Sequence, residues 1–96
     1  MNKPSLVCKK VTFYSPGDEE AFFNWLSSIK GVKRYEYGED GLRLYTSRVT
    51  NSDLWELIGL FYRYNVDMKQ LRQFITGRNE RHFRVAGAFW YTKIFK

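Results

Sequence analysis

The sequence predicts an α+β fold in which a small antiparallel sheet, with the element order β-α-β-β-α, is covered by helices. A short helix and a docked aromatic C-terminal segment are expected to follow this core. Two stretches repeat apolar residues at helical spacing, and two others alternate apolar and polar residues across a glycine-containing turn. The 96-residue chain is 44% apolar and 19% aromatic, which is enough for one core, so we expect a single domain over residues 1–96.

The first strand and the first helix are predicted from the N-terminal third of the chain. Residues 5–14 are rich in Val, Phe and Tyr and are predicted to form a strand. Ser15 followed by Pro16 and acidic residues is typical of a helix start, because serine caps the free amides and proline fits the first turn. We expect this helix to run to about Lys30 and to end at Gly31. Its expected inner face consists of Phe22, Trp25, Leu26 and Ile29.

Residues 32–37 and 42–49 are predicted to form a β-hairpin. Residues 38–41 between them are Gly-Glu-Asp-Gly, a sequence typical of a turn. In the second strand apolar residues alternate with polar and aromatic ones, which suits an antiparallel sheet covered by helices on one face. We expect three tyrosines to gather on the open face, namely Tyr35, Tyr37 and Tyr45.

A helix that begins near residue 51 and ends at Asn65 is predicted to carry much of the core. Asn51 or Ser52 can cap its first turn, and Asn65 suits the left-handed conformation that ends many helices. Gly59 lies inside this helix, where glycine costs about 1 kcal/mol relative to alanine. It therefore predicts the close approach of another element, either a strand or the C-terminal aromatics. The apolar stripe consists of Leu54, Leu57, Ile58 and Phe61, widened by Trp55 and Tyr62.

The segment that follows the central helix has two interpretations. Asp67 can cap a short helix, and apolar residues follow it at helical spacing. A strand over residues 66–74 would put Leu71 on the face opposite Met68, so a helix is preferred. As a strand, the segment would instead complete the β-α-β-β-α-β order of the ferredoxin-like arrangement.

Residue content argues against several functional classes. Cys8 is the only cysteine, which excludes an intrachain disulfide, and with a single histidine the chain cannot build a zinc site. No run approaches the ~20 apolar residues of a membrane span, and residues 1–10 lack the apolar core of a secretion signal, so we expect a cytosolic protein. We find no catalytic motif or cofactor signature. His82, beside Glu80 and several arginines, is the one candidate acid–base group, as in a small ribonuclease.

The net charge of +6 lies entirely in the second half of the chain. Residues 1–57 hold eight basic and eight acidic side chains, whereas residues 58–96 hold eight basic and two acidic ones. A surface of one sign attracts an acidic protein face or nucleic acid, and it also serves solubility. Residues 89–95 are too apolar for a free tail, so we expect them to dock on the domain and to hold nearby arginines on one side. The predicted partner-binding residues are Arg72, Arg78, Arg81, Arg84, Trp90 and Tyr91.

The C-terminal part of the chain resembles a known group of proteins. Residues 60–71 (Leu-Phe-Tyr-Arg-Tyr-Asn-Val-Asp-Met-Lys-Gln-Leu), Asn79 and residues 89–95 (Phe-Trp-Tyr-Thr-Lys-Ile-Phe) are similar to small bacterial proteins encoded beside polymorphic toxins. In particular, they resemble some immunity proteins of contact-dependent growth inhibition systems, over roughly the last 40 residues. The resemblance implies a non-enzymatic cytosolic protein, without a cofactor, that binds and neutralises one toxin domain, often a nuclease.

The positive charge shapes what we expect of such a partner. A basic inhibitor needs an acidic face on the cognate toxin, or it binds away from the toxin's active site. The alternative function is a basic nucleic-acid-binding domain that uses the arginines after Ile58.

Overall fold

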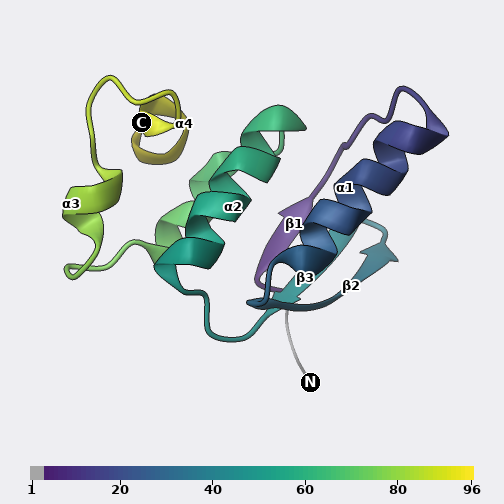
Figure 1. Ribbon diagram of the computed structural model, residues 1–96, viewed down its shortest axis with the longest axis horizontal. Coiled ribbons are helices and arrows are strands. Elements are labelled where there is room, and N and C mark those ends of the chain that lie inside the picture. The colour runs from purple at the N-terminus through teal and green to yellow at the C-terminus, as the bar shows by residue number, and fades with distance from the viewer. Residues whose placement is uncertain (1–3) are drawn as a thin grey trace.

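The computed structural model describes residues 4–96 and contains the predicted α+β core (Figure 1). A three-stranded antiparallel sheet of order β1-β3-β2 lies beside α1 and α2, and α3 and α4 lie on the other side of α2 from the sheet (Figure 1). The elements in chain order are β1 (Leu6–Cys8), α1 (Pro16–Ser28), β2 (Val32–Gly38), β3 (Gly41–Thr46), α2 (Asn51–Arg63), the 3₁₀ helix η1 (Met68–Phe74), α3 (Glu80–Phe83) and α4 (Tyr91–Phe95).

Strand β1 is shorter than predicted, and residues 9–14 leave it as a segment without a strand partner. Cys8 pairs with Leu42, and β3 begins at Gly41, so no strand lies opposite the residues that follow Cys8. The predicted strand is therefore wrong beyond Cys8. The segment keeps its apolar pattern because two of its side chains pack against the core, namely Val11 and Phe13.

Helix α1 begins as predicted and ends slightly earlier. The Ser15 hydroxyl accepts a hydrogen bond from the Asp18 amide at 3.1 Å, and the last helical residue is Ser28. The φ of Gly31 is not positive, so Gly31 does not form the left-handed cap that the prediction of a helix end at this glycine implied. Glycine is needed there because a Cβ would lie 2.8 Å from Asp53 Oδ2. The inner face is confirmed, with Trp25 half-buried and three side chains fully buried: Phe22, Leu26 and Ile29.

Strands β2 and β3 form the predicted hairpin, although β3 ends at Thr46 and not at residue 49 as predicted. Gly38 pairs with Gly41, so the chain reverses at residues 39–40. Gly41 has a φ of +122°, a conformation that side-chain-bearing residues rarely adopt. A Cβ at this position would also collide with the Cys8 carbonyl group, so β1 approaches the turn closely only because residue 41 is glycine.

The three tyrosines of the hairpin do not share the open face, contrary to the prediction. Tyr35 pairs directly with the buried Leu44, so Tyr35 and Tyr37 lie on the face that the helices cover. Both tyrosine rings contact Phe23 of α1, with centroid distances of 5.0 and 6.4 Å. Tyr45 is one residue further along β3 and therefore points to the opposite face. The register of the hairpin decides which face each tyrosine occupies, and this register cannot be read from the residue pattern of one strand alone.

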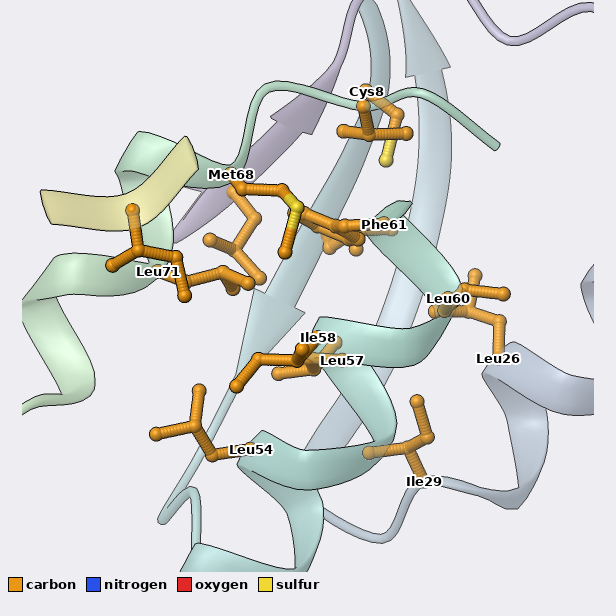
Figure 2. Close-up of a cluster of buried hydrophobic side chains, with 14 of the residues drawn as sticks. Cys8, Leu26, Ile29, Leu54, Leu57, Ile58, Leu60, Phe61, Met68 and Leu71 are labelled. Atoms are coloured by element: carbon orange, nitrogen blue, oxygen red, sulfur yellow. The ribbon is translucent and has the colours of Figure 1, made fainter. Parts of the chain in front are cut away.

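Helix α2 carries the predicted apolar stripe into the centre of the core (Figure 2). Leu60, on the flank of the stripe, is also fully buried and faces Leu26 of α1 (Figure 2). Gly59 lies against Trp25 of α1, so the close approach that we predicted comes from α1 and not from a strand or the C-terminal aromatics. The stripe residues are at most 1% exposed: Leu54, Leu57, Ile58 and Phe61.

Both ends of α2 are closed by specific caps. The N-cap is Thr50 and not Asn51 or Ser52, because Thr50 and Asp53 bond reciprocally, each side chain accepting from the other's backbone amide at 3.1 Å. Asn65 adopts the predicted left-handed conformation, with a φ of 57°. The chain therefore turns sharply after α2 and runs back towards the sheet.

Side chains of η1 occupy the outer edge of β1. The Val7 amide donates to Gln70 Oε1 and Gln70 Nε2 donates to the Val7 carbonyl, both at 2.8 Å. Gln73 Nε2 donates to the Ser5 carbonyl at 3.0 Å. Asp67 caps η1 and residues 68–74 are helical, as predicted, although the helix is 3₁₀. Among the described residues no fourth strand is formed, so the ferredoxin-like alternative is wrong: glutamine side chains take the place of a strand beside β1.

The C-terminal segment docks on the domain, as predicted. Phe83 of α3 and Ile94 of α4 are both fully buried. Trp90 Nε1 donates to the Phe83 carbonyl at 2.7 Å, and Arg72 Nε donates to the Ile94 carbonyl at 3.0 Å. The second bond satisfies a carbonyl that the short helix α4 leaves without an internal partner.

Asn79 ties the turn before α3 to the start of α2. This side chain is only 7% exposed, and a buried amide needs hydrogen-bond partners. Asn79 Nδ2 donates to Asn51 Oδ1 at 2.9 Å and to the Phe74 carbonyl at 3.1 Å, while Asn79 Oδ1 accepts from the Thr76 amide at 2.7 Å. One side chain thus fixes where the chain leaves η1 and enters α3.

Candidate functional site

Four aromatic side chains form a continuous row on the side of α2 that faces the C-terminal segment. We call this row the aromatic surface, and its members are Trp55, Tyr62, Phe89 and Trp90. The ring centroids of Trp55 and Trp90 are 5.0 Å apart, those of Trp90 and Phe89 are 5.0 Å apart, and those of Phe89 and Tyr62 are 4.6 Å apart. All three contacts are edge-to-face, the arrangement that aromatic quadrupoles favour. Two parts of the chain, α2 and the segment before α4, therefore build one surface.

Much of the aromatic surface is open to solvent. Trp55 is 42% exposed, Tyr62 is 45% exposed and Phe89 is 52% exposed. Val85, in the loop that leads to Phe89, is 44% exposed. Contiguous exposed apolar side chains mark interaction sites on soluble proteins, whereas single ones are ordinary.

The aromatic surface rests on buried, hydrogen-bonded groups. The Trp55 ring lies 4.6 Å from the ring of buried Phe83, and the Phe83 carbonyl accepts the indole N–H of Trp90. Gly87, with a φ of +95°, allows the loop to turn back towards α2. The aromatic side chains are consequently held in place before any partner arrives, which lowers the entropy cost of binding.

Two of the predicted arginines make contacts within the fold. Arg72 bonds the Ile94 carbonyl at the end of α4. Arg84 Nε lies 2.6 Å from Glu80 Oε2, and its guanidinium lies 4.3 Å above the centroid of the Phe95 ring. These two side chains hold the C-terminal segment, so their guanidinium groups already have interaction partners within the fold.

The other predicted residues remain available to differing degrees. Arg78 and Arg81 are exposed and form no ion pair within residues 4–96. They flank the start of α3, the helix that supplies Phe83 beneath Trp55. Tyr91 is partly buried, with its ring 5.4 Å from that of Phe95.

Candidate reactive groups lie apart from one another. His82 is exposed on α3. The described residues include no group of three or more His, Cys, Asp or Glu side chains that could hold a metal ion. Cys8 is 1% exposed, and burial raises its pKa to about 12. Its thiol is therefore protonated at neutral pH and unreactive as a nucleophile.

Comparison with protein families, curated proteins and solved structures finds no match. None of the helices in residues 4–96 is both long enough and apolar enough to cross a membrane.

Sequence reasoning assigned Trp55 and Tyr62 to the core, and it did not select Phe89 as a binding residue. A signal for the first two was present in the helix period. Trp55 follows Leu54 and Tyr62 follows Phe61, so each lies about 100° around the helix from the centre of the apolar stripe. No comparable signal existed for Phe89, whose position depends on the path of the loop after α3.

Proposed function

We propose that this chain is a protein-binding module of the immunity type, which binds and neutralises a cognate bacterial toxin domain in the cytoplasm. The observation that supports binding is the aromatic surface: four aromatic side chains stand in continuous ring contact, and three of them are about half exposed. The resemblance of residues 60–71 and 89–95 to immunity proteins of contact-dependent growth inhibition supports the class of partner.

The composition of the aromatic surface suits the centre of an interface. Tryptophan, tyrosine and arginine dominate the residues whose loss costs most binding energy. Each large aromatic side chain buries roughly 150–250 Å² when it is fully covered. Trp55, Tyr62 and Phe89 already have about half of their surface covered, so a partner gains the rest without ordering long flexible side chains.

Two charges at the start of α3, the helix that supplies Phe83 beneath Trp55, favour an acidic face on the partner. Arg78 and Arg81 have no ion-pair partner within residues 4–96, whereas the charge of Arg84 is balanced by Glu80. An acidic toxin face opposite Arg78 and Arg81 would satisfy both guanidinium groups. Charges at the rim of an interface act mainly on the association rate and its salt dependence.

The test uses the toxin domain encoded by the neighbouring gene. Isothermal titration calorimetry measures the dissociation constant of the complex between this domain and the present chain. We expect Trp55→Ala and Phe89→Ala each to weaken binding by about 30-fold, the effect of a typical hot-spot residue. Tyr37→Ala is the matched control, because Tyr37 is a 68% exposed aromatic residue on β2, outside the aromatic surface. This control is expected to bind within twofold of the wild type.

A second pair of variants tests the charges. Arg78→Glu combined with Arg81→Glu is expected to weaken binding about tenfold and to slow association. The matched control reverses Lys30 and Lys33, which are exposed where α1 leads into β2. If the neighbouring gene encodes no protein that this chain binds, or if Tyr37→Ala weakens binding while Phe89→Ala does not, the proposal is wrong.

A further inference from the structure

A groove runs along the C-terminal end of α2, at a place that sequence reasoning did not select. It consists of three adjoining hollows with volumes of about 430, 480 and 220 Å³, all of which are lined in part by Asn65. The first hollow lies between residues 10–14 and the end of α2, and the second lies between β1 and η1. The third reaches Tyr62. We call these three hollows together the basic groove.

Local structure explains why the groove exists. The left-handed Asn65 ends α2, and the Val66 amide donates back to the Phe61 carbonyl at 2.9 Å, so the chain turns away abruptly. Residues 9–14 have no strand partner and pass this turn as a separate segment. The groove is the space between two segments that no hydrogen-bonded ladder joins.

Positive charge dominates the walls of the groove. Lys10 and Arg63 line the first hollow, Lys9 and Lys10 line the second, and Lys93 lines the third. None of these four cations forms an ion pair within residues 4–96. Two of them, Lys9 and Lys10, come from the half of the chain that has no net charge. The positive patch therefore arises from folding and is not visible in the charge of either half.

Two carboxylates also line the groove, but both are engaged by the fold. Asp18 accepts from the Tyr64 hydroxyl and from the Tyr14 amide, both at 3.0 Å. Burial, and then the bond to Asp18, raise the pKa of Tyr64, so this hydroxyl keeps its proton and remains a donor at neutral pH. Asp67 accepts from the Lys69 amide at 3.0 Å as the cap of η1. Neither carboxylate forms an ion pair with any of the four cations.

We propose that the basic groove binds an extended acidic segment of the partner protein, whose carboxylates contact Lys9, Lys10 and Arg63. This inference rests on the proposed function and adds a second contact region to it. The two regions are continuous, because Tyr62 belongs to the aromatic surface and also lines the third hollow. Lys93 Nζ lies 5.9 Å from the centroid of the same tyrosine ring. A partner that covers the aromatic surface can therefore extend directly into the groove.

The side chains of the groove favour an acidic peptide over single-stranded nucleic acid. Nucleic-acid channels present a row of aromatic side chains on which bases stack. Three tyrosines line the groove: Tyr14 is 89% exposed and Tyr62 is 45% exposed, whereas Tyr64 is half-buried and its hydroxyl bonds Asp18. A phosphate backbone carries a charge at every nucleotide and would have to pass Asp18 and Asp67. A peptide can place uncharged residues opposite these carboxylates and acidic ones opposite the cations.

The experiment measures binding of three fluorescein-labelled probes to the full chain by fluorescence anisotropy. The probes are a ten-residue peptide of alternating Glu and Gly, the same peptide with Gln in place of Glu, and a ten-nucleotide oligothymidylate. The groove variant carries Lys9→Glu, Lys10→Glu and Arg63→Glu. The matched control carries Lys30→Glu, Lys33→Glu and Arg48→Glu, which make the same charge change about 20 Å away, near the start of α2.

We expect the wild type and the control variant to bind the Glu-Gly peptide at low salt within twofold of each other, and the groove variant to bind at least tenfold more weakly. The Gln-Gly peptide should not bind. Equal weakening by both variants would show a non-local charge effect and overturn the inference. Tighter binding of the oligothymidylate than of the Glu-Gly peptide, or no binding of the peptide, would also overturn it. If the triple variant does not fold, the double variant Lys10→Gln with Arg63→Gln replaces it. An unchanged affinity of this double variant for the Glu-Gly peptide would then contradict the inference.

A parallel titration with the toxin domain separates this inference from the proposed function. Loss of toxin binding in Phe89→Ala, together with unchanged toxin binding in the groove variant, would retain the aromatic surface and reject the groove. Unchanged toxin binding in both variants would reject both proposals. Weakened binding in both variants, with the control at Lys30, Lys33 and Arg48 unaffected, is the expected result.

Discussion

Replacing Gly59 by alanine is expected to destabilise this protein, although alanine is the better helix former. Glycine inside a helix costs about 1 kcal/mol relative to alanine, so the substitution alone would be favourable. A Cβ at residue 59, however, would lie 3.3 Å from Cζ2 of Trp25 and 3.5 Å from Cη2. Ordinary contacts between carbon atoms are about 3.5–4.0 Å, so the indole has to move to accommodate the new methyl group.

The indole of Trp25 is held against such a movement. Its Nε1 donates to Glu56 Oε1 at 2.9 Å, which links α1 to α2 across the site. Overpacking in a well-packed site typically costs about 1–3 kcal/mol. Subtracting the gain in helix propensity leaves a net loss of about 1 kcal/mol in the free energy of unfolding. For a domain of this size that loss lowers the thermal midpoint by about 4–8 °C.

A double-mutant cycle with Trp25→Phe isolates the cause. Phenylalanine lacks the atoms that the new methyl group meets, so Gly59→Ala in this background should raise stability by about 1 kcal/mol. Urea denaturation followed by circular dichroism measures all four proteins. Gly77→Ala is the control, because a Cβ there meets nothing within 4 Å and the change should be neutral or slightly stabilising. Equal stabilisation by Gly59→Ala in both backgrounds would refute the reasoning.

A truncation and a substitution test how the C-terminal segment and the sheet are held. Removing residues 88–96 takes away buried Ile94 and the hydrogen bond from Trp90 Nε1, and the loss of these two side chains costs roughly 3–6 kcal/mol. We therefore expect the truncated protein to show no cooperative thermal transition near the wild-type midpoint. The control variant Phe89→Ala should melt close to the wild-type midpoint. Gln70→Met keeps the size of the side chain but breaks both bonds to Val7, which should cost about 2 kcal/mol; a midpoint within 2 °C of the wild type would contradict this role of Gln70.

Local chemistry allowed several features to be predicted from the sequence. Ser15 begins α1 and Asn65 ends α2, because capping depends on residues within one turn of the helix end. The apolar period predicted the buried stripe of α2, and Gly59 correctly indicated a close neighbour. For the caps and the stripe, the decisive residues are adjacent in sequence or on the same helix face, whereas the neighbour of Gly59 lies on α1 and was not identified from the sequence.

Features that depend on distant partners were not predictable in the same way. Strand β1 ends at Cys8 because β3 begins at Gly41, and nothing in residues 9–14 contains that information. The bond between Asn79 and Asn51 joins positions that carry no shared pattern. The basic groove combines cations from three parts of the chain, and counting charges by halves obscured it.

The glutamine side chains on β1 leave the sheet with a single edge at which another strand can be added. The backbone of Val7 is already bonded to Gln70, so a strand from a second molecule would have to displace that amide. Within residues 4–96, the outer side of the seven-residue β2 has no strand partner. A molecule with one free edge can join only one other copy through its sheet, because the first pairing consumes the edge that a third copy would need. Open-ended fibril growth through this sheet therefore stops at two molecules.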